Sequence, residues 1–240
     1  MVYFISDAHF GVESAQKETR KRETLASFLH TIRNDAESLY VLGDLFDFWF
    51  EYKTVIPRDF YNIISGFHDL IRDGVNVSYI CGNHDFWQRG FLEEEVGMKI
   101  YRYSLEQKIY GKKIFLAHGD GLTPDTGYIL LKSILRNRFN ISLYSMLHPD
   151  VGIGLARLAS KLSRRNSNKK HKRDTLLNFA DSKFEEGFDY VILAHTHKPT
   201  FYRKGGKVYM NIGDWMENFS YGKLWKDGVS LKFFHSGRVK

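Results

Sequence analysis

Two histidines, His195 and His197, stand one residue apart directly after an apolar run, residues 191–194. Side chains two residues apart on an extended backbone point to the same side, so both imidazoles would face one point in space. Imidazole nitrogen is the commonest metal-binding group among protein side chains. The pair therefore predicts a metal site at the end of a β-strand.

Four earlier apolar runs also end in residues that can bind a metal ion. Residues 2–6 lead to Asp7 and His9, 39–42 to Asp44, 77–80 to Asn83, and 113–117 to His118. A single residue of this kind is most often a polar side chain that has a backbone partner. The recurrence of such residues at five strand ends instead favours one shared site, because open α/β sheets bind their ligands at the carboxyl ends of the strands.

The seven side chains offer carboxylate oxygen, amide oxygen and imidazole nitrogen, and no thiolate. This set suits manganese, iron, zinc, nickel or cobalt better than copper(I) or an iron–sulfur cluster, and it is too rich in nitrogen for calcium or magnesium. Seven ligands exceed the three or four protein ligands that one such ion usually takes. They fit two ions that share a bridging carboxylate, an arrangement that holds a phosphoryl group and activates water.

The elements that would position these residues alternate between strand and helix. Helical patterns cover residues 23–37 and 58–74, which gives the order expected of a layered α/β sandwich. The alternating pattern of residues 221–234 predicts a closing antiparallel hairpin. Residues 122–180 fit no such unit and predict helices at 127–139 and 151–163. We therefore expect one domain, 1–240, with a helical and basic insertion at about 122–180.

Composition restricts the class of protein and its partners. Hydrophobic residues make up 43% of the chain, enough for a sizeable core, and Cys81 is the only cysteine, which favours a reducing, cytosolic compartment. The sequence predicts neither an export signal nor a membrane-spanning segment. A net charge of +7 favours an anionic partner, whether a nucleotide, a nucleic acid or an acidic lipid surface.

The motifs DAH (7–9), GDLFD (43–47), GNHD (82–85), HGD (118–120) and HTH (195–197) resemble, in this order, those of the calcineurin-like metallophosphoesterases. The resemblance implies a β-sandwich flanked by helices and two divalent ions, with manganese expected first. It implies that Asp7, His9 and His197 hold one ion, that Asn83, His118 and His195 hold the other, and that Asp44 bridges them. It also implies that His84 assists catalysis and that Asp85 orients His84 through a hydrogen bond.

Within that superfamily the chain is most similar to the UDP-2,3-diacylglucosamine pyrophosphatases of lipid A synthesis, through GDLFDFWF, HGDGLTPDTGY and HTHKP. This likeness implies cleavage of the diphosphate to UMP and a diacylglucosamine 1-phosphate, under a helical cap that binds the acyl chains. The substrate contacts that it implies are Asn83, His84, Asp125, Ser163, Asn166, Lys169 and His195. The resembled enzymes have arginine in the place of His84.

Residues 161–173 contain seven Lys and Arg and no acid. Such a segment is commonly a solvated surface, but here it could also bind a diphosphate or attach the protein to an anionic membrane leaflet. We therefore expect a cytoplasmic protein in peripheral contact with the inner membrane face. The alternatives are a phosphoesterase for nucleotides, nucleic acid or phosphoprotein, with nucleic acid disfavoured, and a non-catalytic binding module. The latter is disfavoured because every ligand position is filled.

Overall fold

The computed structural model describes residues 1–122, 132–167 and 176–235, and the side chains among these outside 161–167. The strands are β1 (Val2–Ile5), β2 (Ser38–Val41), β3 (Asn76–Ile80), β4 (Lys99–Tyr101), β5 (Ser104–Ile109), β6 (Lys112–Ala117), β7 (Tyr190–Leu193), β8 (Thr200–Lys204), β9 (Lys207–Asn211), β10 (Ser220–Trp225) and β11 (Gly228–Phe233). The helices are α1 (Ala15–Ile32), a 3-10 turn (Arg58–Phe60), α2 (Tyr61–Arg72), α3 (Phe91–Glu94), α5 (Arg138–Tyr144), α6 (Pro149–Ser167) and α7 (Leu176–Glu185).

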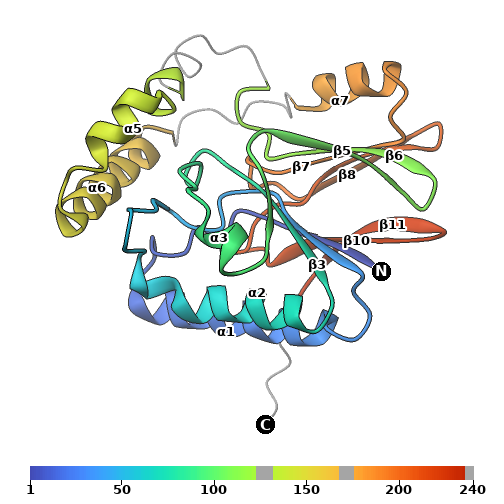
Figure 1. Cartoon of the computed structure of the whole chain (residues 1–240). Helices are drawn as coiled ribbons and strands as arrows, with labels where there is room; N and C mark the ends of the chain where they lie inside the picture. The colour runs from blue at the N-terminus through green and yellow to red at the C-terminus, as the bar shows by residue number, and fades with distance from the viewer. Residues whose placement is uncertain (123–131, 168–175, 236–240) are drawn as a thin grey trace.

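The strands form two sheets, which are stacked as the two central layers of the molecule (Figure 1). The first sheet has the order β11-β10-β1-β2-β3-β4, in which β1 to β4 are parallel. The second has the order β5-β6-β7-β9-β8, in which β6, β7 and β9 are parallel. Parallel strands end at the same edge of their sheet, so the segments that follow β1, β2 and β3 lie together, as do those that follow β6 and β7.

The alternation of side chains along each central strand explains why the strands are apolar throughout. Val2 and Phe4 of β1 point between the two sheets, where they join Ile114 and Ile192 of the second sheet in one buried cluster. Their neighbour Tyr3 points the other way, toward the helices. Both faces of the strand are therefore buried, as parallel sheets covered on both sides require.

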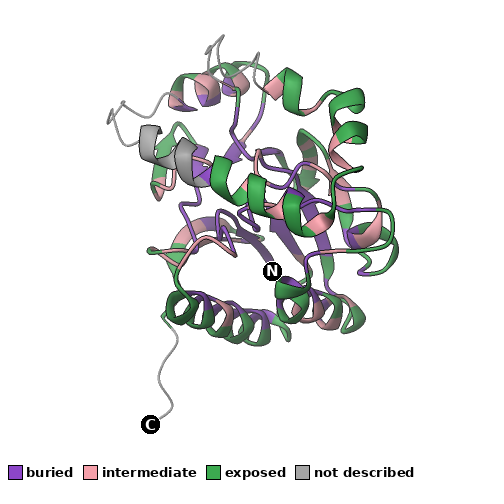
Figure 2. Cartoon of the chain, turned by 90° about the vertical axis from the view of Figure 1, so that its left-hand side faces the viewer, coloured by how far each residue is buried: buried purple, intermediate pink, exposed green. Residues whose placement is uncertain are grey.

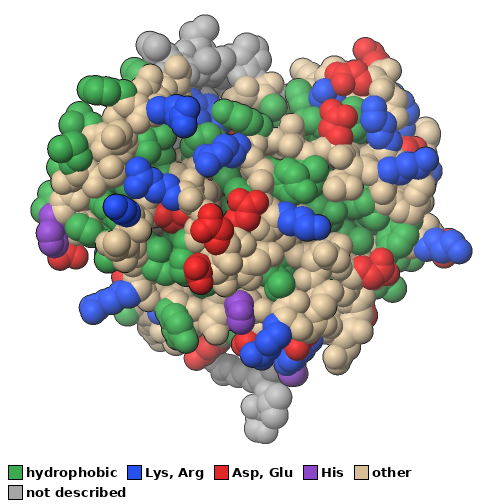
Figure 3. Space-filling view, in the orientation of Figure 1, with side chains coloured by type: hydrophobic (Ala, Val, Ile, Leu, Met, Phe, Trp, Pro, Cys, Tyr) green, Lys and Arg blue, Asp and Glu red, His purple; other side chains and the backbone are tan. Residues whose placement is uncertain are grey.

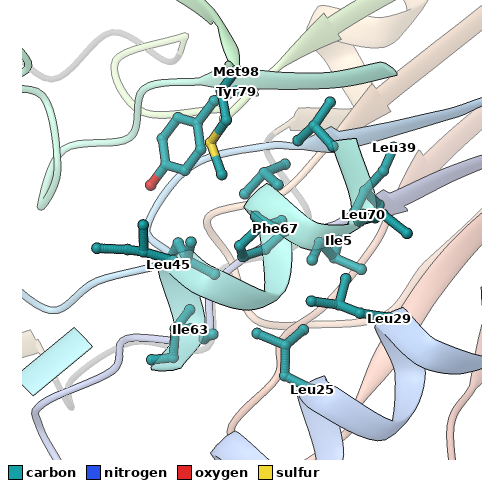
Figure 4. Close-up of a cluster of buried hydrophobic side chains, with 14 of the residues drawn as sticks. Ile5, Leu25, Leu29, Leu39, Leu45, Ile63, Phe67, Leu70, Tyr79 and Met98 are labelled. Carbon is teal, nitrogen blue, oxygen red and sulfur yellow. The ribbon is translucent and has the colours of Figure 1, made fainter. Parts of the chain in front are cut away.

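The outer layers are helices that bury an apolar stripe against each sheet. Helix α2 places Ile63, Phe67 and Leu70 on one face, and Figure 4 shows them directed at the same cluster as Leu25 and Leu29 of α1. On the opposite side of the molecule, α7 covers the second sheet through a cluster that includes Leu176, Ala180 and Phe184. The result is a four-layer sandwich of helix, sheet, sheet and helix.

The structure confirms the predicted order of strands and helices and corrects several boundaries. All five runs that precede the candidate ligands are strands, and the predicted hairpin is β10 and β11. Helix α1 begins eight residues before the predicted start and ends five before the predicted end. Residues 132–135 of the predicted helix 127–139 are helical, but this helix ends before Asn137, whose extended backbone caps a new helix, α5. Strands β4, β5 and β8 were not predicted.

Helices α5 and α6 belong to the predicted insertion and are fastened to the body by polar and aromatic contacts. The Ser160 hydroxyl donates to Asp47 Oδ1 at 3.1 Å, and the Arg157 guanidinium lies 3.1 Å from the carboxylate of Asp59. The Tyr144 ring packs on Phe50 with 4.7 Å between ring centroids. No helix among the described residues has the length and apolar character needed to cross a bilayer.

Candidate metal centre

The predicted ligands converge where the strands of the two sheets end, although up to 190 positions separate them in the sequence. Ligand atoms of Asp7, His9 and His197 lie within 4.8 Å of one another, and so do those of Asp44, His118 and His195. The first group comes from the segments after β1 and β7, and the second from those after β2, β6 and β7. Each group thus combines residues of both sheets.

Asp44 lies between the two groups. Its Oδ2 atom is 3.3 Å from His118 Nε2 and 3.7 Å from His9 Nε2, while its Oδ1 atom accepts a hydrogen bond from the backbone N–H of His84 at 2.9 Å. One carboxylate oxygen is therefore held by the backbone, and the other faces an imidazole of each group. This is the geometry that a bridging ligand needs.

Asp7 is arranged in the same way within the first group. Its Oδ2 accepts the backbone N–H of His195 at 3.1 Å, and its Oδ1 faces His197 Nε2 at 3.3 Å and His9 Nε2 at 3.7 Å. The Nε2 atoms of His9 and His197 are themselves 3.3 Å apart. Three donor atoms from distant segments therefore surround one point.

In the second group, a backbone carbonyl determines which nitrogen of His118 faces the metal centre. His118 Nδ1 lies 2.7 Å from the carbonyl oxygen of Leu42, which can only accept, so Nδ1 carries a proton and Nε2 is the nitrogen that faces Asp44. That Nε2 is 3.2 Å from His195 Nδ1. The carbonyl of Leu42 thus orients His118 toward the carboxylate of Asp44.

The backbone is strained where it presents these side chains. Five of the seven described non-glycine residues with positive φ are candidate ligands, with φ between 42° and 70°: Asp7, His9, Asp44, His195 and His197. The left-handed conformation costs an L-residue roughly 1–2 kcal/mol. Strain of this kind concentrates at functional sites, where the surrounding fold holds it in place.

Gly82 allows the segments after β2 and β3 to approach each other. A Cβ atom on Gly82 would lie 2.6 Å from the backbone nitrogen of Asp44 and would overlap the carboxylate of the same residue. Gly43 is equally confined, since its Cβ would lie 2.9 Å from His118 Nδ1. Because Gly43 of GDLFD and Gly82 of GNHD have no side chain, the segments around Asp44 can pack closely.

The ionisable groups of the centre shift one another's pKa strongly. Burial opposes ionisation of Asp7, but the charges of His197 and His118 outweigh it and lower the Asp7 pKa to about 2. Burial also disfavours a charged His118, yet the adjacent Asp44 holds its pKa well above the usual value. Burial, with the charge of His118 beside it, lowers the pKa of His195 to about 4. The buried carboxylates thus stay ionised and favour positive charge between them.

Two buried oxygens indicate that metal ions fit this donor set. Among the described residues, neither Asp7 Oδ1 nor Asn83 Oδ1 has a hydrogen-bond partner. A buried polar atom without a partner costs about 1–3 kcal/mol, so such atoms in a native fold need an explanation. Carboxylate and amide oxygens beside neutral imidazole nitrogens are suitable ligands for a divalent ion, which would satisfy them.

A buried lysine that the sequence analysis missed holds the segment after β1. Lys21 Nζ donates to the carbonyl oxygens of Ala8 and His9 at 2.8 and 3.1 Å and pairs with Glu18 at 3.0 Å. Its side chain is 2% exposed, and this burial lowers its pKa. A signal was present in the sequence, because Lys21 falls on the apolar stripe of α1, four residues before Leu25.

Asp85 fixes the segments after β2 and β3 rather than His84. Its buried carboxylate accepts the backbone N–H groups of Gly82 and Leu45, each at 2.8 Å, and the hydroxyl of Tyr79. The expected hydrogen bond to His84 is not among its contacts within the described part of the chain, because His84 Nδ1 instead faces the carbonyl oxygen of Asp47 at 2.8 Å. That carbonyl, which can only accept, directs the His84 proton to Nδ1.

His84 lies at the open side of the centre. Its ring packs edge to face against His9 with 4.8 Å between centroids, and its side chain is 21% exposed. It is thus accessible to solvent, as is the candidate ligand His197, whose side chain is 33% exposed. This position suits a group that contacts a phosphate oxygen.

A second missed residue, Arg136, connects the insertion to two ligand-bearing segments. Its guanidinium donates to the carbonyl oxygen of Gly82 at 3.2 Å and to Asp120 Oδ2 at 3.3 Å, and it stacks on Phe86 at 3.8 Å. Lys132 also pairs with Asp120, at 2.5 Å. Gly82 precedes Asn83, and Asp120 follows His118 by two residues, so the insertion braces both ligands.

The substrate contacts implied by resemblance are only partly described. Ser163 and Asn166 belong to α6, whose backbone is described at these positions, whereas Asp125 and Lys169 lie outside the described residues. Asn83 follows Gly82, which lies against Asp44, and its Oδ1 atom is buried, while His195 contacts Asp7 and His118.

Comparison with known proteins agrees with this geometry. The sequence profile of the calcineurin-like phosphoesterases matches residues 1–199. This chain belongs to that family. The family implies divalent metal ions, and the clustered side chains described above are candidates to hold them.

Relatives of this phosphoesterase match it over nearly their whole length. A UDP-2,3-diacylglucosamine hydrolase of Porphyromonas gingivalis is 31% identical, over 96% of this chain and 95% of its own. A protein of the same name from Haemophilus influenzae is 28% identical, over 91% and 92%. An archaeal phosphodiesterase of known structure shares the fold with a TM-score of 0.50 and 14% identity, over 97% and 98% of the two chains.

The close approach at Gly82 generates a testable prediction. Gly82→Ala should displace Asp44 and reduce the number of divalent metal ions retained after gel filtration, measured by mass spectrometry of the metal. Gly154→Ala is the matched control, because a Cβ atom at Gly154 in α6 would meet no described atom within 4 Å. Equal metal content in the folded Gly82→Ala variant and the wild type would contradict the role assigned to this glycine.

Proposed function

We propose that this phosphoesterase holds two divalent metal ions, manganese before iron, zinc, nickel or cobalt. One ion would be bound by Asp7, His9 and His197, and the other by Asn83, His118 and His195. Asp44 would bridge them. The two groups of ligand atoms within 4.8 Å, with the Oδ2 atom of Asp44 facing both, support this assignment for the histidines and aspartates, and the unsatisfied buried Oδ1 of Asn83 supports it for Asn83.

The substrate that we propose is UDP-2,3-diacylglucosamine, cleaved at its diphosphate to UMP and 2,3-diacylglucosamine 1-phosphate in lipid A synthesis. The observation that carries this proposal is the full-length similarity to proteins named for hydrolysis of this compound. A nucleotide-linked glycolipid also agrees with a protein that carries excess positive charge.

The insertion would form a cap over the metal centre and contact the substrate. Its Ser160 is anchored beside the centre by Asp47, so the following turns of α6, with Ser163 and Asn166, start next to the reacting groups. Lys169 and Asp125 are proposed contacts from the sequence. Because the substrate carries two acyl chains, we place the protein in the cytoplasm in peripheral contact with the anionic inner membrane surface.

The residues of the chain have separate tasks in the proposed reaction. When bound, the two ions supply Lewis-acid polarisation of the phosphate and activation of water. The backbone contacts of Asp7, Asp44 and His118 hold their donor atoms in place before substrate arrives, which favours in-line positioning. With its Nδ1–H held by the Asp47 carbonyl, His84 would act through Nε2 in its doubly protonated form, in which it can stabilise charge on a phosphate oxygen or protonate a departing group.

The proposed function predicts manganese-dependent release of UMP from detergent-solubilised UDP-2,3-diacylglucosamine. Chromatography of the nucleotide product measures this release. Activity should disappear after chelation and return with manganese, while double-stranded DNA and phosphopeptide substrates remain intact. Absence of UMP with every one of the five metals, together with hydrolysis of a nucleic acid or phosphoprotein, would replace this substrate with another phosphoester.

The position of His84 predicts a different phenotype from that of a ligand. His84→Ala should lower kcat roughly 10²- to 10⁴-fold, as expected for loss of a general acid or a charge-stabilising group, while the bound metal remains. His68 is an exposed histidine of α2, and His68→Ala should leave both kcat and the amount of bound metal unchanged. Unchanged kcat in a metal-replete His84→Ala variant would remove His84 from the chemistry.

A further inference from the structure

The insertion is held on the body by few contacts. None of its residues 132–160 belongs to the three buried hydrophobic clusters of the described chain, and α5 has no buried residue. Figure 2 looks onto α5 and α6 and shows mostly exposed and half-buried residues along both helices. The insertion therefore depends on individual polar and aromatic contacts for its position, rather than on a shared core.

One of these contacts, made by Arg136, reaches the metal centre. Figure 3 shows Lys and Arg side chains spread over the surface, also on the side that carries α5 and α6, whereas the Arg136 side chain is 11% exposed. Its guanidinium donates to the carbonyl oxygen of Gly82 and to Asp120 Oδ2, and it stacks on the ring of Phe86. A guanidinium held by two acceptors and an aromatic ring has a fixed position, which a lysine ammonium would not reproduce.

The residues just before Arg136 contact the same two segments. Lys132 Nζ donates to the carbonyl oxygen of Asp120 at 3.1 Å and also pairs with the carboxylate of Asp120. Trp87, in the segment after β3, donates from Nε1 to the carbonyl oxygen of Leu135 at 3.0 Å. This part of the insertion thus joins the segment after β3 to the segment after β6.

The two joined segments carry ligands of the same proposed ion. Asn83 directly follows Gly82, and His118 precedes Asp120 by two residues. Together with His195, these ligands are assigned to one ion, which we call the second ion. The contacts described above therefore converge on one of the two ions.

The other ion, which we call the first ion, has different supports. We assign it to Asp7, His9 and His197. Lys21 of α1 donates to the carbonyl oxygen of His9 at 3.1 Å, and the carboxylate of Asp47, which accepts from Ser160, lies 3.7 Å from His9 Nδ1. None of the contacts of Arg136 given above involves these residues. Loss of the Arg136 side chain should therefore affect the two ions unequally.

We propose that Arg136 is a positioning residue for the second ion. Without its guanidinium, the buried Gly82 would lose a hydrogen bond and the buried carboxylate of Asp120 would lose a neutralising charge. Both losses are costly in a buried position, and they favour movement of the segments that carry Asn83 and His118. The inference rests on the ligand assignment of the proposed function and goes beyond it, because it couples the position of the insertion to one metal ion.

The test titrates the metal-free full chain with buffered zinc and follows the imidazole signals of nitrogen-15-labelled histidine by nuclear magnetic resonance. The signals of His9 and His197 report the first ion, and those of His118 and His195 report the second. In Arg136→Met, the zinc midpoint of the second pair should rise about 10- to 100-fold relative to that of the first pair, the usual cost of removing a group that holds a metal ligand. An unchanged ratio of the two midpoints would overturn the proposal. So would an equal shift of both midpoints, which general destabilisation produces.

Arg157→Met is the matched control. Arg157 also fastens the insertion to the body, but its partner Asp59 lies in the 3-10 turn, which contains no candidate ligand. This variant should keep the wild-type ratio of the two midpoints. Arg136→Lys retains the positive charge beside Asp120 but not the two-acceptor geometry, so its ratio should fall between those of the wild type and Arg136→Met. A ratio in Arg157→Met that changes as much as in Arg136→Met would overturn the specific role of Arg136.

A measurement on the wild type tests the same coupling without a variant. Coupling between two sites is reciprocal, so bound zinc should slow amide hydrogen exchange in residues 132–144 of the insertion. Equal exchange of these amides with and without zinc would overturn the proposal. Zinc bound at a single site per chain would contradict the proposed metal centre, and the inference would fail with it. None of these experiments uses the glycolipid, so failure of UMP release is a separate result.

Discussion

The carboxylate of Asp44 is the interaction on which the rest of the site depends. It is fully buried, one of its oxygens is held by the backbone of His84, and the other faces His9 and His118 from different sheets. A buried negative charge is costly unless cations or polar hydrogens surround it. The strained backbone at five candidate ligands and the close packing at Gly82 and Gly43 bring side chains around it, and Lys21 holds the segment that carries His9.

The fold makes this arrangement by stacking two sheets whose parallel strands end at a common edge. Each candidate ligand then needs only a short segment after its strand, so small side chains such as Asp and Asn can reach the same point. Residues deeper in the loops hold these segments: Asp85 binds two backbone N–H groups, and Arg136 connects the insertion to the segments after β3 and β6. Through Arg136 and Asp47, the insertion and the centre are one connected structure.

Most of the fold and the identity of the converging residues could be predicted from the sequence, because strands buried on both faces are apolar throughout and end abruptly in polar ligands. Strand β5 was missed because its residues alternate between exposed and half-buried positions at a sheet edge, so SLEQKI has no continuous apolar run. The role of Arg136 could not be predicted, because it depends on contacts with residues that are 16 and 54 positions away in the sequence. The orienting partner of His84 was misassigned for a related reason, because a backbone carbonyl leaves no trace in side-chain identity.

The insertion differs from the body of the protein in its positive charge and in its exposed apolar surface. Its inner side is tied to the body through Ser160, Arg136 and Tyr144, and its exposed side chains include the apolar Phe139 and Leu143.

The central claim is that Asp44 joins two metal ions in one centre. The most direct measurement is titration of the metal-free protein with manganese, followed by electron paramagnetic resonance. The account predicts two ions per chain with the signal of an exchange-coupled pair, because a shared carboxylate places the ions about 3.5–4 Å apart. A single ion per chain, or two ions without coupling, would contradict it.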